Sequence, residues 1–455
     1  MQEQVAVQTD VRPPLFSGSA LRRLIIPLVI EQFLAMTIGM ADTMMVTSVG
    51  EHAVSGVSLV DNISILLINI FSALATGGAV VAAQYLGSRD EPNACAAAKQ
   101  LFYAIAALST AMMAVCLLFR EPILRLVFGT LDDDVMTAAM TYFLLTSISY
   151  PFLAIYNAGA ALFRSMGNSK VSMFASLLMN IVNIGLNAVL IYGVGIGVAG
   201  AGFGTLASRL VGALLMTWLI CQPHNPIHIS GLFRPEFQNQ LVKKILRIGV
   251  PNGMENGMFQ VGKLMVLGLV TPLGTSATAA NAIANSVAAM VNVPGNAVSL
   301  SLITVVGQCM GTGDSRQAVG YTRKLMTIVY LSMGALSLSL FFAAGPVVSF
   351  FGLTPAAARM AVEVLRWCSV FTAVFWPMSF VLPNALRAAG DARFTMIVSM
   401  FSMWVFRVGF CYLMVLKFHC GLLFIWMGMF LDWAMRSLFF CVRFVRGRWM
   451  EQKVI

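Results

Sequence analysis

The chain has 455 residues, of which 58% are hydrophobic and only 11% are charged, and its net charge is +10. A soluble protein is about 25% charged, so this composition excludes a soluble enzyme, a disordered chain and a fibrous repeat. The basic residues lie between apolar runs, which indicates membrane topology rather than nucleic-acid binding.

Twelve apolar segments, each long enough to cross a bilayer as a helix, follow one another along the chain. The first contains Glu31 and Asp42 and follows a polar stretch, so it is a transmembrane helix rather than a cleavable signal. The predicted segments are 24–48, 57–83, 97–118, 137–160, 170–193, 198–221, 246–270, 278–307, 319–345, 359–383, 393–415 and 421–442.

The longest polar interruption separates the sixth and seventh segments and holds three prolines followed by a basic stretch. We expect a linker there that ends in a short interfacial helix. The predicted organisation is an amino-terminal tail at 1–23, a first lobe at 24–221, the linker at 222–247, a second lobe at 248–442 and a carboxy-terminal tail at 443–455.

Basic residues are distributed unevenly between the two sides of the membrane. Twenty of the 29 Lys and Arg fall in the termini and the even-numbered connections, and only four fall in the odd-numbered ones. The positive-inside rule therefore places both termini and the linker in the cytoplasm, with the protein in the cytoplasmic membrane.

The two lobes repeat each other at a nearly constant offset in residue number. The matched pairs are Pro27 and Pro251, Glu31 and Glu255, Gln84 and Gln308, Gly87 and Gly311, and, at an offset shorter by one, Arg164 and Arg387. Each repeat holds six helices, so both enter the membrane from the same side. The predicted fold is an all-α integral membrane protein with two parallel six-helix repeats, related by a pseudo-two-fold axis along the membrane normal, around a central cleft. This is the geometry of an alternating-access transporter.

Several short motifs together resemble those of the multidrug and toxic compound extrusion (MATE) family, over about residues 20–440. Their order, spacing and duplication make the resemblance specific. They are Ile26-Pro27 to Ala41-Asp42-Thr43, Gly167-Asn168-Ser169-Lys170 leading into Asn183-x-x-x-Asn187, Gly197-Val198-Ala199-Gly200-Ala201-Gly202, Val306-Gly307-Gln308 with Met310-Gly311, and Leu386-Arg387-Ala388-Ala389-Gly390-Asp391. The family exports cationic or amphipathic compounds, driven by inward Na⁺ or H⁺.

The resemblance implies a coupling-cation site in the first lobe, made of Asp42, Asn183, Asn187 and Thr205. Helical rise puts all four in the outer half of the membrane at similar depth, and Asn180 shares the helical face of the two asparagines. If the coupling ion is Na⁺, the four oxygen-bearing side chains are its ligands. A proton would instead reside on the carboxylate. A polar network that only holds three helices together is the alternative.

A second constellation consists of Glu31 and Glu255, each four residues after a helix-kinking proline, Pro27 or Pro251. We expect the two carboxylates to line the substrate cavity, where unpaired anions would favour organic cations. The alternative is that each Glu caps a helix or pairs with a neighbouring Arg.

Three further residues of the seventh helix complete the predicted cavity, namely Met258, Gln260 and Lys263. Gln260 stands where some family members carry a Glu, so a second cation site in the second lobe is not expected. Lys263 either pairs with a carboxylate across the cleft or indicates an anionic or zwitterionic substrate. Asp432 and Arg436 are one helical turn apart and are expected to neutralise each other.

The predicted function is a secondary antiporter that exports small amphipathic, cationic compounds in exchange for Na⁺ or H⁺. We expect a monomer in contact with membrane lipid, no nucleic-acid partner and no cofactor beyond the coupling ion. The eight Cys lack disulfide or zinc spacing. A lipid-linked oligosaccharide flippase of the same superfamily is the first alternative, and an integral membrane enzyme is a distant one.

Overall fold

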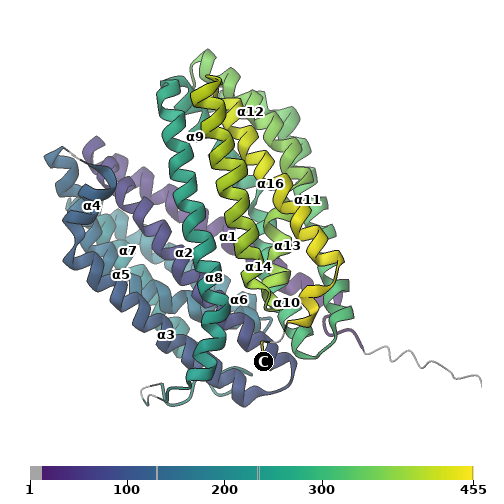
Figure 1. Ribbon diagram of the computed structural model, residues 1–455. Helices are drawn as coiled ribbons and strands as arrows, with labels where there is room; N and C mark the ends of the chain where they lie inside the picture. The colour runs from purple at the N-terminus through teal and green to yellow at the C-terminus, as the bar shows by residue number, and fades with distance from the viewer. Residues whose placement is uncertain (1–12, 130–131, 233, 235, 453) are drawn as a thin grey trace, which may run out of the picture.

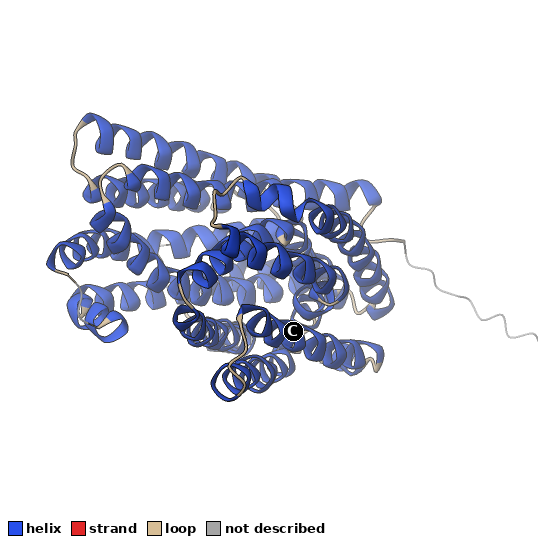
Figure 2. Cartoon of the chain, turned by 90° about the horizontal axis from the view of Figure 1, so that it is seen from above, coloured by secondary structure: helices blue, strands red, loops and turns tan. Residues whose placement is uncertain are grey.

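The computed structural model describes residues 13–455 except 130, 131, 233, 235 and 453. Nearly all of this described part is helical, and no strand occurs in it (Figure 2). The helices form two bundles, one from each repeat (Figure 1).

The first bundle contains seven helices and a short π-helical segment. These are α1 (Gly18–Thr47), α2 (Glu51–Gly87), α3 (Glu91–Leu118), α4 (Arg120–Phe128), α5 (Asp133–Ser165), α6 (Ser169–Ala188), η1 (Val189–Gly193) and α7 (Val198–Ile220). The short α4 lies in the connection between the third and fourth membrane spans.

The second bundle follows the same order with more interruptions. Its elements are α8 (Asn239–Val270), η2 (Thr271–Leu273), α9 (Thr275–Val291), α10 (Val293–Gly311), α11 (Ser315–Ser349), α12 (Pro355–Val374), η3 (Pro377–Val381), α13 (Leu382–Ala388), α14 (Ala392–Ser402), η4 (Met403–Gly409), α15 (Phe410–Tyr412), η5 (Leu413–Lys417), α16 (Leu422–Val445) and η6 (Arg448–Glu451).

The membrane spans agree with the predicted series of twelve. Ten helices of the described chain are long and apolar enough to cross a membrane, and α12 with η3–α13 is an eleventh span bent by 60°. The twelfth is α8, which is 32 residues long but carries Glu255, Gln260 and Lys263 among its apolar residues. The predicted all-α, two-repeat architecture is therefore confirmed.

One predicted span, 278–307, is broken in the structure. Its counterpart in the first repeat, α2, is a continuous helix of 37 residues. The equivalent stretch of the second repeat divides at Asn292 into α9 and α10, and Pro294 lies at the start of α10. Proline has no N–H to continue the helical hydrogen bonding, which accounts for the break.

The linker also differs from the prediction. Helix α8 begins at Asn239 and continues to Val270, so 239–247 forms its first turns rather than a separate interfacial helix. The segment before α8 is held against α3. The Tyr103 hydroxyl donates to the carbonyl oxygen of Leu232 over 2.7 Å, and the Gln100 side-chain amide donates to that of Glu236 over 2.6 Å.

The two bundles meet where α2 packs against α8 and α10, and α2 crosses α10 at the matched glycines Gly87 and Gly311. A Cβ on Gly87 would overlap the Gln308 carbonyl oxygen, and a Cβ on Gly311 would overlap that of Gln84. Only glycine permits this approach of two backbones.

Each glutamine at this crossing also reaches into the opposite bundle with its side chain. Gln84 Nε2 donates to the carbonyl oxygen of Ala388, and Gln308 Nε2 donates to that of Ser165, both over 2.7 Å. The acceptors Ser165 and Ala388 occupy matched positions of the two repeats, so the two hydrogen bonds between the bundles are equivalent. From this end, which also holds the carboxyl terminus, the bundles diverge toward α4 and the start of α12 (Figure 1).

A bulky side chain at the crossing should separate the bundles at this end. We expect Gly87→Val to lengthen the distance between spin labels on exposed Glu91 and Arg316, measured by double electron–electron resonance in a Cys-free background. Gly320→Val is the control, because a Cβ on this helical glycine meets nothing within 4 Å. An unchanged distance distribution for Gly87→Val would show that the crossing tolerates a side chain.

Candidate functional site

Polar side chains from five helices gather inside the first bundle. We call this group the amino-lobe cluster. It consists of Asp42 on α1, Asp61 on α2, Tyr142 on α5, Asn183 and Asn187 on α6, and Thr205 and Arg209 on α7. Intramembrane polar groups of this kind are rare and tend to mark functional sites.

The predicted coupling residues of α1 and α6 are in direct contact. Asn187 Nδ2 donates to Asp42 Oδ1 over 2.6 Å and lies 3.4 Å from Asn183 Oδ1. The Asn187 carboxamide has room because α7 presents Gly204, where a Cβ would overlap Asn187 Oδ1. Glycine at this position thus lets α7 approach α6 and brings the neighbouring Thr205 to the cluster.

Asp61 and Tyr142 belong to the cluster but were not predicted. The Asp61 carboxylate interacts with the Tyr142 hydroxyl and with the Arg209 guanidinium, and it lies close enough to Asp42 for the two carboxylates to repel each other. The signal in the sequence was a carboxylate inside the apolar run 57–83. It was overlooked because the family resemblance directs attention to the first, fifth and sixth helices.

The cluster carries one net negative charge when Asp42, Asp61 and Arg209 are charged and Tyr142 is neutral. Two carboxylates face one guanidinium, and Arg209 also donates through Nη1 to Ser149 Oγ over 2.7 Å. Asn187 Oδ1 has no hydrogen-bond partner within the described chain. Carboxylate, amide and hydroxyl oxygens suit a hard cation, so either a monovalent cation or a proton can neutralise the cluster.

Asn180 lies one turn before this contact, on the same face of α6. It is buried, and its Nδ2 donates to the Ser176 carbonyl oxygen over 2.9 Å. Its Oδ1 has no partner in the part of the chain that the structure describes. Asn180 therefore borders the cluster without a recorded contact to Asp42.

Glu31 and Glu255 are both ion-paired, which corrects the expectation of unpaired carboxylates. Glu31 Oε1 lies 3.0 Å from Arg164 Nη1, and Glu255 Oε1 lies 2.6 Å from Arg387 Nη2. The two Glu are only 7% and 8% exposed. The two arginines occupy matched positions of the repeats, so each lobe neutralises its own glutamate. The predicted preference for cationic substrates, which required unpaired glutamates, therefore has no support from these residues.

The prolines before these glutamates lie inside continuous helices. Pro27 is within α1 and Pro251 within α8. Pro27 cannot donate to the Arg23 carbonyl, and the Ser169 hydroxyl lies 3.3 Å from that oxygen and donates to the Leu24 carbonyl over 2.6 Å. A side chain of α6 thus compensates for the N–H that Pro27 lacks.

A second polar group lies inside the other bundle. We call it the carboxyl-lobe cluster, and it consists of Lys263 on α8, Arg407 on η4, and Asp432 and Arg436 on α16. The predicted Asp432–Arg436 pair is confirmed, with Arg436 Nε 2.8 Å from Asp432 Oδ1. The carboxylate partner expected for Lys263 is not found among the described residues. Arg407 was not singled out, although it stands inside the apolar run 393–415.

The other predicted cavity residues lie on α8 between these charged groups. Met258 and Gln260 are half-buried. Gln260 has no recorded side-chain hydrogen bond in the described chain. Their contact with a substrate stays a prediction.

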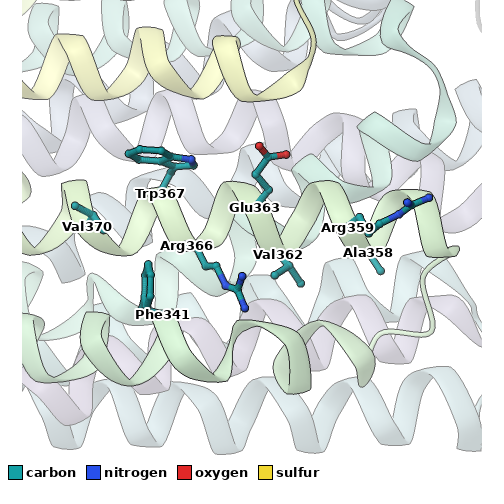
Figure 3. A pocket seen from close by; sticks show the side chains of 8 residues that line it. All are labelled: Phe341, Ala358, Arg359, Val362, Glu363, Arg366, Trp367 and Val370. Carbon is teal, nitrogen blue, oxygen red and sulfur yellow. The ribbon is translucent and has the colours of Figure 1, made fainter.

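A separate groove of about 780 Å³ lies between α11 and α12 (Figure 3). Glu363 and Trp367 project from one side of α12, whereas Arg366 projects from the other side. Its lining residues are Phe341, Ala358, Arg359, Val362, Glu363, Arg366, Trp367 and Val370. None of them belongs to either cluster.

Two polar clusters within two repeated helical lobes define a multi-pass membrane transporter. The MatE family model matches the chain twice, at residues 27–189 and 251–413. The matches begin at Pro27 and at its repeat partner Pro251, as the internal repeat requires. The chain belongs to the MatE family and is a MATE-type efflux transporter.

Curated relatives support this assignment. The chain is 27% identical over 444 residues to the probable multidrug resistance protein NorM of Thermotoga maritima, covering 95% of this chain and 93% of the relative. It is 21% identical over 373 residues to the FAD transporter of Shewanella oneidensis, covering 80% of each.

Solved structures share the fold. A MATE protein in the bent conformation matches with a TM-score of 0.86 and 22% identity, covering 94% of both chains. A MOP superfamily transporter from Pyrococcus furiosus, described with a binding pocket of reverse polarity, matches with a TM-score of 0.88 and 21% identity. That match covers 95% of this chain and 96% of the other.

The buried ion pair of the second lobe should be sensitive to loss of one partner. We expect Glu255→Gln to lower stability by about 3–5 kcal/mol, because it leaves Arg387 buried and unpaired. Thermal unfolding of the purified protein, followed by intrinsic tryptophan fluorescence, measures the change.

The matched control is Glu121→Gln, which breaks the exposed Glu121–Arg125 pair and should change stability by less than about 1 kcal/mol. The double variant Glu255→Gln/Arg387→Met should recover part of the loss. Equal effects of the buried and exposed substitutions would contradict the assigned role of the buried pair.

Proposed function

We propose that the protein is a secondary active antiporter that exports small amphipathic compounds in exchange for inward Na⁺ or H⁺. The observation that carries this proposal is the amino-lobe cluster, with one net negative charge inside a membrane-spanning bundle. Membership of the MATE family supports export as the direction of transport.

The amino-lobe cluster gives coupling a physical route. Asp42 accepts a hydrogen bond from Asn187, which joins α1 to α6. A proton or Na⁺ on Asp42 competes for the same carboxylate oxygens, so loading the site alters the α1–α6 contact. Since α1 also packs against α10 of the other lobe, the change reaches the surface between the lobes.

The crossing of α2 and α10 supplies the closed side of an alternating-access cycle. The positive-inside distribution assigns this side to the cytoplasm, together with both termini. In this assignment the structure corresponds to the state closed to the cytoplasm. Return to the other state requires the reciprocal hydrogen bonds of Gln84 and Gln308 to break.

The proposed substrate class rests on the relatives and on the ion pairs of Glu31 and Glu255. The relatives include probable multidrug resistance proteins and an FAD transporter, which favours small molecules over lipid-linked oligosaccharides. The predicted preference for cations rested on free Glu31 and Glu255, and both are ion-paired. The proposal therefore specifies amphipathic compounds without a preferred positive charge.

Coupling through Asp42 is tested by dye uptake into everted vesicles, with a Na⁺ or an H⁺ gradient imposed separately. We expect Asp42→Asn to abolish gradient-driven uptake of both ethidium and fluorescein, because it removes the carboxylate that binds the cation. Asn187→Ala should weaken uptake less, since it removes one neutral ligand, and Asp61→Asn should impair it as well.

Asp132→Asn serves as the control, because this carboxylate is exposed at the start of α5. Membrane insertion of each variant is checked by immunoblot of the vesicles. Normal gradient-driven uptake by Asp42→Asn would refute coupling through the amino-lobe cluster.

The assignment of sides is tested by labelling. Asn239 is exposed at the start of α8. In a Cys-free background, Asn239→Cys should resist an impermeant maleimide added to intact cells and react once the cells are permeabilised. Rapid labelling of intact cells would reverse the proposed orientation.

A further inference from the structure

We propose that Lys263 and Arg407 form a subsite in the carboxyl lobe that binds the carboxylate or phosphate group of an amphipathic organic anion. The inference builds on the proposed transport function by naming the chemistry of its substrate. It rests on the charge, burial and contacts of the carboxyl-lobe cluster.

The two lobes carry opposite charge on equivalent helices. The first lobe places Asp42 on α1, and the repeat makes α8, which carries Lys263, the equivalent helix of the second lobe. In the same way α6, with its asparagines, corresponds to α14–η4 with Arg407. The amino-lobe cluster has one net negative charge, whereas the carboxyl-lobe cluster contains three cations and a single carboxylate, Asp432.

Arg407 is a buried guanidinium that is attracted by the nearby Asp432 carboxylate but makes no recorded hydrogen bond with it in the described chain. It is 7% exposed, and the structure records no hydrogen bond or ion pair for it within the described residues. Its recorded close contact is with the ring of Phe259, at 5.3 Å from Cζ to the ring centroid. Burying an arginine without a paired anion is costly, and a bound carboxylate or phosphate would relieve the cost through paired N–H donors.

Asp432 attracts Arg407, but no hydrogen bond or ion pair joins the two among the described residues, and Asp432 is ion-paired with Arg436. Its Oδ2 has no hydrogen-bond partner in the part of the chain that the structure describes. Its Oδ1 accepts from Arg436 Nε over 2.8 Å and from Ser402 Oγ over 2.6 Å. Arg436 is fixed further by donating to the Ser399 carbonyl oxygen. A water between Asp432 and Arg407 would satisfy hydrogen bonds, but one carboxylate still leaves two of the three positive charges uncompensated.

Lys263 lies at the accessible edge of the cluster. It follows Phe259 by one helical turn, and Phe259 faces both Arg407 and Arg436. Lys263 therefore points to the same side of α8, yet its residue is exposed, whereas Arg407 is buried. Lys263 and Arg407 are close enough to repel each other. An anion bound between them would attract both cations and offset their repulsion.

An aromatic wall adjoins the two cations. Phe259 meets Phe380 edge to face with 6.1 Å between ring centroids, and Phe380 lies 5.2 Å from Trp376 and 6.0 Å from Trp433. Trp376 and Trp433 are buried behind the partly exposed Phe259 and Phe380. The two phenylalanine rings are therefore the part of the wall that can contact the apolar body of a ligand whose charged end meets Lys263. Arg407 also stands in the π-helical segment η4, and π-helical turns are frequent at functional sites.

The test is equilibrium binding of two xanthene dyes of opposite charge, fluorescein and rhodamine 123, to the purified full-length protein in phosphatidylcholine nanodiscs. Fluorescence anisotropy measures the affinities without any ion gradient. We expect Arg407→Gln and Lys263→Gln each to weaken fluorescein binding about tenfold or more, with rhodamine 123 binding unchanged or tighter. Arg407→Lys should retain most of the fluorescein affinity.

The matched control is Arg366→Gln, which removes a membrane-helix arginine of the separate groove on α12 and should change neither dye. Because Lys263 is exposed, its substitution keeps the test valid even if the Arg407 variants fold poorly. Failure of the unmodified protein to bind fluorescein, or equal losses for both dyes, would overturn the subsite.

A repeat in nanodiscs containing phosphatidylglycerol separates a soluble anion from a lipid headgroup. Unchanged fluorescein affinity supports a soluble ligand, whereas competition that Arg407→Gln removes would assign the subsite to lipid and refute our proposal. Since no gradient is used, loss of this binding leaves the coupling test on Asp42 untouched. Failed coupling with normal fluorescein binding would refute only the antiport function.

Discussion

The close crossing of α2 and α10 joins the two lobes at one end, where Gly87 packs against the Gln308 backbone and Gly311 packs against the Gln84 backbone. Without side chains at these positions, the backbones approach until a Cβ would overlap the opposite carbonyl oxygen. This proximity lets Gln84 and Gln308 reach carbonyls of the other lobe. The same end carries the ion pairs of Glu31 and Glu255, so its rigidity comes from repeated, matched contacts.

The repeated scaffold holds two sites of opposite charge on equivalent helices. Equivalent helices retain their glutamate–arginine pairs, which stabilise each lobe. Deeper in the lobes the residues have diverged. Asp42 and Asp61 make one interior acidic, whereas Lys263 and Arg407 make the other basic. A transporter with this division can load a cation in one lobe and an organic anion in the other without competition between them.

The sequence was sufficient for the architecture and for part of the sites. Hydropathy, the constant offset between matched motifs and the distribution of Lys and Arg predicted twelve spans in two repeats. The four-residue spacing predicted that Asn183 and Asn187 share one face of a helix, and in the structure both interact with Asp42. Partners distant in the chain could not be predicted in this way. That Arg164 reaches Glu31, or that Tyr142 reaches Asp61, depends on the rotation and tilt of whole helices, which local patterns do not encode.

The break at Asn292 gives the two lobes different mechanical properties. In the first lobe α2 is a single helix of 37 residues. In the second lobe the corresponding helix is divided between α9 and α10, and α12 is bent by 60° against η3–α13. The acidic cluster thus lies in the lobe with the continuous helix, and the basic cluster lies in the lobe with the interrupted helices. Closure around a substrate would then be asymmetric, with most of the deformation on the carboxyl-lobe side.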